Sequence, residues 1–119
     1  MFNIIFYRDK KGNEPVKDYI VSLKEGKGKD NYVKLNKIQD YLDILRNNGT
    51  RAGKPYVKHI DGEIWKLRPL KDRILFFAYN GSDIILLSHF RKMTQKTPKK
   101  EVEKAKRYMK DYLERSMEK

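Results

Sequence analysis

Cysteine is absent from this chain of 119 residues, and histidine occurs only twice. Without cysteine there is no disulfide framework, no thiolate metal ligand and no cysteine nucleophile. Two histidines are also too few for a histidine-rich metal site. We therefore expect a protein that works without a metal ion or another cofactor.

Long apolar runs are missing as well. No stretch approaches the roughly 18 apolar residues that a membrane-spanning helix needs. The apolar residues 2–7 form too short a run, without preceding basic residues, for a signal peptide. We expect a cytoplasmic protein that makes no contact with membranes.

Positive charge is abundant: 28 Lys and Arg residues stand against 16 Asp and Glu residues, which gives a net charge of +12. A domain this basic attracts polyanions. A solvated, lysine-rich surface is the simpler alternative. We favour contact with nucleic acid because Arg and Lys are repeatedly inserted into the strand-like runs of residues 64–98.

The patterning predicts one α+β domain over residues 1–119. Apolar residues at a spacing of three or four predict helices at residues 15–23 and 31–47 and from Pro98 onward. Alternation and turn residues predict strands at residues 2–7, 64–70, 73–79 and 84–90, with a short strand or extended segment at 56–60. We expect a small twisted antiparallel sheet packed against an N-terminal helical hairpin, with a C-terminal helix.

Alternation along the strands places the side chains of that sheet on two faces with different roles. One face would be the core side, formed by Trp65, Leu67, Ile74, Phe76, Ile85 and Leu87. The other face would be cationic, since Lys66 and Arg68 point the same way and neighbouring strands bring further basic residues alongside. We expect the following side chains to converge there: Lys66, Arg68, Arg73, Tyr79, His89, Arg91, Lys92 and Lys96.

Such a face is suited to cleaving RNA without a metal ion. Arginines bind phosphate with two parallel hydrogen bonds and stabilise the charge that develops on it. Proton transfer needs a lysine whose pKa is lowered by cationic neighbours, or His89. The residues alone leave that choice open.

Two segments also resemble a known family. Residues 61–68 read DGEIWKLR, Arg73 opens the next strand, and residues 85–105 read ILLSHFRKMTQKTPKKEVEKA. Together they resemble the phage-derived, HigB-like branch of the RelE/ParE superfamily of bacterial toxins. The resemblance implies a RelE-like fold and an endoribonuclease toxin of a type II toxin–antitoxin system, which cuts messenger RNA on the ribosome.

The resemblance also implies partners and site residues. The partners would be messenger RNA, ribosomal RNA and a helix-turn-helix, HigA-like antitoxin, with DNA bound only through the antitoxin complex. The family's basic positions correspond to Arg68, Arg73, Arg91, Lys92 and Lys96, and Lys66 stands where related toxins carry a lysine on a strand.

We therefore assign two sets of roles. The predicted catalytic residues are Arg68, Arg73, Lys92 and His89, and the predicted RNA-binding residues are Lys66, Tyr79, Arg91 and Lys96. The alternative is a non-catalytic phage-derived protein that binds nucleic acid or only an antitoxin.

Overall fold

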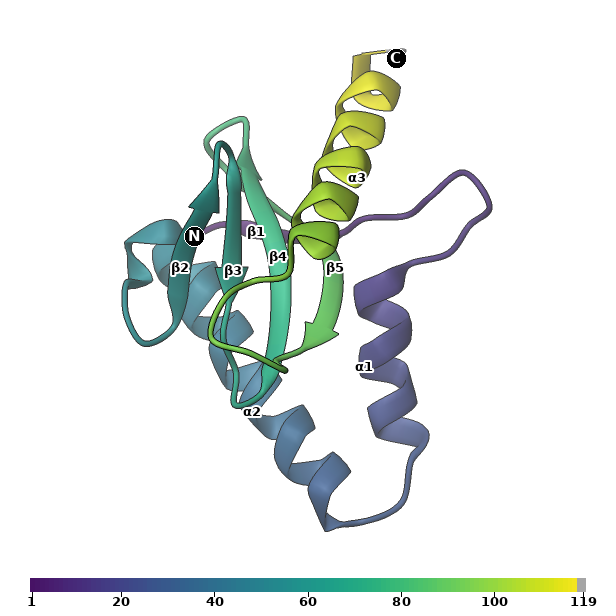
Figure 1. The fold of residues 1–119 in the computed structure, drawn as a ribbon, viewed down its shortest axis with the longest axis vertical. Helices are drawn as coiled ribbons and strands as arrows, with labels where there is room; N and C mark the ends of the chain where they lie inside the picture. Colours follow the sequence, from purple (N-terminus) through teal and green to yellow (C-terminus); the bar gives the residue numbers. More distant parts are fainter. Residues whose placement is uncertain (118–119) are drawn as a thin grey trace.

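The computed structural model describes residues 1–117. In chain order the elements are β1 (Asn3–Phe6), α1 (Pro15–Glu25), α2 (Lys29–Asn48), a short 3₁₀ helix (Gly49–Ala52), β2 (Val57–Asp61), β3 (Ile64–Leu67), β4 (Asp72–Tyr79), β5 (Asp83–Arg91) and α3 (Lys99–Met117). The strands form one five-stranded sheet in the order β1-β5-β4-β3-β2. Figure 1 shows α2 behind this sheet and α3 in front of it. The predicted α+β class is confirmed.

The sheet is antiparallel from β2 to β5, but β1 pairs in parallel with β5. The antiparallel pairing predicted from the sequence is confirmed for β2 to β5 and is wrong for β1. Parallel neighbours need a long crossover, and here the helical hairpin and three strands lie between the two partners. No local pattern in residues 2–7 could specify a partner so far along the chain.

Residues at the helix ends explain where the two helices of the hairpin begin and end. Pro15 stands at the first turn of α1, where its missing N–H costs nothing. Gly49 ends α2 at a φ of +60°, and its N–H donates to the carbonyl of Leu45. The buried stripes of α1 and α2 face the sheet, as predicted.

Both faces of the sheet are buried, so the protein has two apolar clusters. The first lies under α1 and α2 and takes the sheet residues Val57, Leu67, Ile74, Phe76, Ile84 and Leu86. The second lies under α3 and takes Tyr7, Ile64, Leu75, Phe77, Ile85 and Leu87, with Ala105 from the helix. The predicted core side is therefore wrong for Ile85 and Leu87. An amphipathic helix must bury its stripe somewhere, and α3 buries it on the face predicted to be cationic.

A β-bulge between β4 and β5 fixes which charged residues share a face. Phe76 lies opposite Leu86 and Leu75 lies opposite Ser88, so Leu87 is an extra residue in β5. One extra residue exchanges the faces of every later side chain in that strand. Beyond the bulge, His89 lies opposite Ile74, and Phe90 lies opposite Arg73.

No helix in residues 1–117 is both long enough and apolar enough to cross a bilayer.

Candidate functional site

A cationic cleft lies on the α3 side of the sheet, where β3 and β4 meet the segment 92–97 that leads to α3. In Figure 1 this green segment crosses in front of the lower ends of β3 and β4. The cleft encloses about 80 Å³ and is lined by Lys58, Lys66, Arg68, Arg73, Phe90, Lys92, Thr94, Gln95, Lys96 and Thr97. Among residues 1–117, no Asp or Glu side chain lines it. Within residues 1–117, no three His, Asp or Glu side chains are grouped so that they could hold a metal ion.

The strand register brings the cations together. Lys66 and Arg68 are two residues apart, so they point to the same side of the sheet. Lys66 pairs with Leu75 across β3 and β4, and Arg73 lies two residues before Leu75 on that same side. Because all three side chains lie near the turn between β3 and β4, their charges add at one end of the sheet.

Lys66 is the residue best suited to accept a proton. It is only 6% exposed, and its Nζ donates a hydrogen bond to Thr97 Oγ1 at 2.9 Å. Burial, and then the charges of Arg73 and Arg68, lower the pKa of Lys66 to about 8. Roughly a tenth of such amines are neutral at pH 7, which allows Lys66 to act as a general base.

Arg73 is held by the backbone of the turn beside it. Its Nη1 donates to the carbonyls of Leu70 and Asp72, each at 2.7 Å. The side chain is 5% exposed, and burial, followed by the charge of Arg68, lowers its pKa. The guanidinium is therefore fixed in place at the wall of the cleft before any anion arrives.

Arg68 has an unused donor. Its Nε is buried and makes no hydrogen bond to any described residue. An unsatisfied donor on a charged group costs about 1–3 kcal/mol or more. A phosphate oxygen bound in the cleft would satisfy it and would gain a charge-assisted hydrogen bond.

His89 belongs to a network on the opposite side of the sheet. Its Nε2 lies 2.9 Å from Asp72 Oδ1, and its ring stacks on Tyr19 of α1 with centroids 3.6 Å apart. The Tyr19 hydroxyl donates to the same Asp72 oxygen at 2.8 Å. Burial alone would raise the pKa of Asp72, but the hydrogen bonds from His89 and Tyr19 hold it below its usual value.

The structure thus brings together five of the eight predicted site residues: Lys66, Arg68, Arg73, Lys92 and Lys96. The other three do not converge on them. The bulge turns His89 and Arg91 toward the helical hairpin, where Arg91 lies near Asp72. Tyr79 is at the far end of β4 and packs edge-on against Phe77 and Tyr112, at 6.2 and 5.8 Å between centroids.

Five residues that line the cleft were not among the predicted site residues, and two of them lie beside Lys66. Lys58 of β2 pairs directly with Lys66, and Thr97 accepts the hydrogen bond from Lys66. The turn residues Asp61 and Gly62 could have predicted the position of Lys58, since a hairpin there places residues 57–61 beside β3. Thr97 gave no comparable signal because its contact depends on how segment 92–97 folds back.

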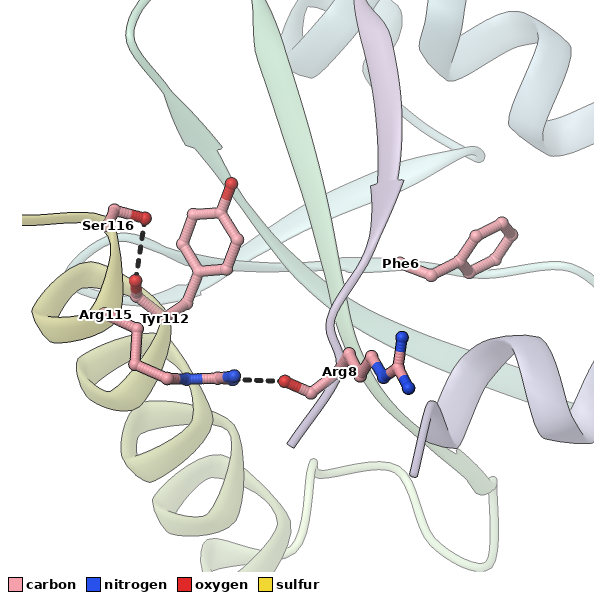
Figure 2. A pocket seen from close by; sticks show the side chains of 5 residues that line it. All are labelled: Phe6, Arg8, Tyr112, Arg115 and Ser116. Atoms are coloured by element: carbon pink, nitrogen blue, oxygen red, sulfur yellow. Dashed lines mark hydrogen bonds between the residues drawn. The ribbon is translucent and has the colours of Figure 1, made fainter. Parts of the chain in front are cut away.

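A second cavity, of about 210 Å³, lies near the C-terminal end of α3. Figure 2 shows Arg115 pointing to the carbonyl of Arg8, to which it donates a hydrogen bond. The Ser116 hydroxyl donates to the carbonyl of Tyr112 at 2.8 Å. The bond from Arg115 ties α3 to the segment after β1, and none of the residues that line this cavity lines the cationic cleft.

Comparison with known proteins places the chain in a family. Residues 28–110, more than two thirds of the chain, match the model of the family described as phage derived protein Gp49-like (DUF891). No curated protein matches the chain. The matched range runs from just before α2 into α3 and includes every residue that lines the cationic cleft. The chain therefore belongs to the phage-derived Gp49-like family, which is associated with RelE-like toxins of toxin–antitoxin systems.

Proposed function

We propose that this protein is the toxin of a type II toxin–antitoxin pair, of the HigB-like branch, and that it inhibits translation by cutting messenger RNA on the ribosome. The observation that carries the proposal is the cationic cleft, in which Lys66, with its lowered pKa, lies beside Arg68 and the fixed Arg73. The family association supports the class of protein.

In the proposed reaction the 2′-hydroxyl oxygen of one nucleotide attacks the phosphorus that follows it. Its proton passes to the neutral amine of Lys66, and the bond from phosphorus to the 5′-oxygen breaks. The Lys92 ammonium protonates that leaving oxygen. The products are a 2′,3′-cyclic phosphate and a 5′-hydroxyl, and each proton transfer typically contributes about 10²–10⁴-fold.

Arg68 and Arg73 supply electrostatic stabilisation. Negative charge builds up on the phosphate oxygens in the transition state, and donors fixed beforehand stabilise it without reorganising. Arg73 is fixed by two carbonyls, and Arg68 brings an unsatisfied Nε. Lys96 would bind a flanking phosphate at the rim. His89 has no part in proton transfer in this scheme, because it is bonded to Asp72 on the other face.

The partners in this proposal follow from the family association and the charge. A net charge of +12 favours ribosomal RNA. A helix-turn-helix antitoxin would neutralise the toxin, and the complex, not the toxin alone, would bind DNA. The site of action would be the cytoplasm, where translating ribosomes are.

Induction of the protein in cells without an antitoxin tests the proposal. Wild type should arrest growth and leave messages with new 5′-hydroxyl ends, whereas Lys66→Met should do neither. Lys110→Met, which removes an exposed lysine of α3, should behave as wild type. Folded Lys66→Met that arrests growth fully would refute the role of Lys66. Salt-dependent RNA binding without cleaved messages would favour the non-catalytic alternative.

A further inference from the structure

A cavity larger than the cleft lies on the other side of the turn between β3 and β4. It encloses about 360 Å³ and is lined by Lys34, Leu70, Lys71, Asp72 and Arg91. We call it the turn pocket. Its volume falls within the range of about 300–1,000 Å³ that is usual for ligand sites.

The turn pocket carries an excess of positive charge. Lys34, Lys71 and Arg91 form none of the ion pairs found among residues 1–117. The one acid, Asp72, is 1% exposed and already interacts with Tyr19 and His89. A ligand that enters the pocket therefore meets three cations and a single carboxylate that is already hydrogen-bonded.

Leu70 gives the pocket an apolar wall at a cost to stability. Its φ is +57°, in the left-handed region, where residues other than glycine are strained by about 1–3 kcal/mol. It is also 49% exposed. Glycine would relieve the strain, so a leucine here is best explained by something apolar that packs on it.

The turn forms a narrow wall between the turn pocket and the cationic cleft. Arg73, in the cleft, donates to the carbonyl of Leu70. The backbone N–H of Lys92 donates to the carbonyl of Lys71 at 2.7 Å. Because successive strand residues point to opposite faces, Arg91 faces the turn pocket and Lys92 faces the cleft. Cations thus line both sides of a single turn.

We infer that the turn pocket is a nucleotide subsite, in which a base of single-stranded RNA packs on Leu70 while its neighbouring phosphates meet Lys34, Lys71 and Arg91. The same strand would pass over the turn and place another phosphate in the cationic cleft, so the inference rests on the proposed function. RNA is favoured over an acidic peptide because its phosphates repeat at regular intervals and could meet cations on both sides of the turn.

The first test measures the affinity of a short, fluorescently labelled, single-stranded oligoribonucleotide by anisotropy. Leu70→Gly removes the apolar wall and suits the backbone, and Arg91→Ala removes one cation. Each should weaken binding about five- to tenfold, in line with the loss of one apolar contact or one charge-assisted hydrogen bond. Lys110→Ala, on α3, should weaken it less than about twofold and serves as the matched control for charge.

The second test uses oligonucleotides in which one base at a time is removed to leave an abasic site. With wild type, removal of the base at one position should lower the affinity more than removal at any other. With Leu70→Gly, removal of the base at that position should lower the affinity no further, because the base and the leucine contribute through the same contact. Additive losses at every position would overturn the inference.

The remaining outcomes separate the subsite from the proposed function, since affinity does not depend on cleavage. If Leu70→Gly and Arg91→Ala both bind RNA as Lys110→Ala does, or if wild type does not bind it, there is no nucleotide subsite, even if wild type still cuts messages. If both variants keep RNA affinity but lose the antitoxin, the pocket is a protein-docking site. If the two variants bind RNA more weakly than wild type does, but wild type cuts no messages, the subsite stands and the proposed nuclease is refuted.

Discussion

Asp72 binds Arg73 through its backbone carbonyl, 2.7 Å from Nη1, while its carboxylate lies on the other face of the sheet. There it meets Tyr19 of α1 and His89 of β5. The helical hairpin therefore helps to fix the position of an arginine in a cleft that it does not touch. We therefore propose a positioning role for His89 in place of the predicted catalytic one.

Asp72→Ala should destabilise the protein by about 2–4 kcal/mol, because it leaves the half-buried Tyr19 and His89 side chains without their partner. It should also reduce cleavage, since the carbonyl that holds Arg73 loses its anchor. Denaturation in urea measures the first effect. The control is Asp40→Ala, on the exposed surface of α2, which should change stability by less than about 0.5 kcal/mol. Equal stabilities for the two variants would rule out the network.

Lys66→Met should stabilise the protein at neutral pH. The folded pKa of about 8 lies below the ordinary 10.5, so the folded state resists protonation and the charged amine costs stability. That cost is fully present below pH 8 and disappears as pH rises toward 10.5. We expect a gain of about 1–3 kcal/mol at pH 7 that shrinks by pH 10. Urea denaturation at both pH values measures it, and Lys110→Met should show no such trend.

Thr97→Val should lower cleavage about tenfold or more while costing only about 1 kcal/mol of stability. The variant keeps the shape of the side chain but removes the acceptor that orients the Lys66 amine. Thr97→Ser keeps the hydroxyl and should restore most of the rate. Equal rates for the serine and valine variants would show that the hydrogen bond has no role in orienting Lys66.

Tyr7→Phe should loosen α3 from the sheet. The Tyr7 hydroxyl donates to Asp111 Oδ2 at 2.6 Å, and Arg115 lies 5.7 Å above its ring. Burial, and then this bond, raise the pKa of Tyr7. Loss of the bond to a carboxylate should cost about 1–3 kcal/mol, measured by thermal unfolding. Tyr32→Phe, at an exposed position of α2, is the control.

Local signals in the sequence predicted much of the fold. Pro15, Gly49 and the apolar stripes located the helices, and alternation located the central strands. The pairing of β1 could not be predicted from local patterns because its partner strand lies about 80 residues further along the chain. The burial of the second face was also missed, since it depends on where α3 packs.

The predicted convergence of cations holds for β3 and the start of β4, but it fails for His89 and Arg91 of β5, which share one physical reason. With no extra residue in β5, the pairing of Phe76 with Leu86 would place His89 opposite Arg73, as expected. The bulge at Leu87 places Phe90 there and turns His89 away. Ile84–Leu87 is apolar on both faces, so no alternation in this segment reveals a shift of one residue.

Cleavage of messenger RNA on purified ribosomes, as a function of pH, tests the central claim most directly. With wild type, the single-turnover rate should rise about tenfold per pH unit below pH 8 and level off above it, because the neutral Lys66 amine is the base. The product should carry a 2′,3′-cyclic phosphate, and Lys66→Arg, which stays charged, should be inactive at every pH. Undiminished cleavage by Lys66→Arg, or no cleavage by wild type on ribosomes, would contradict the account.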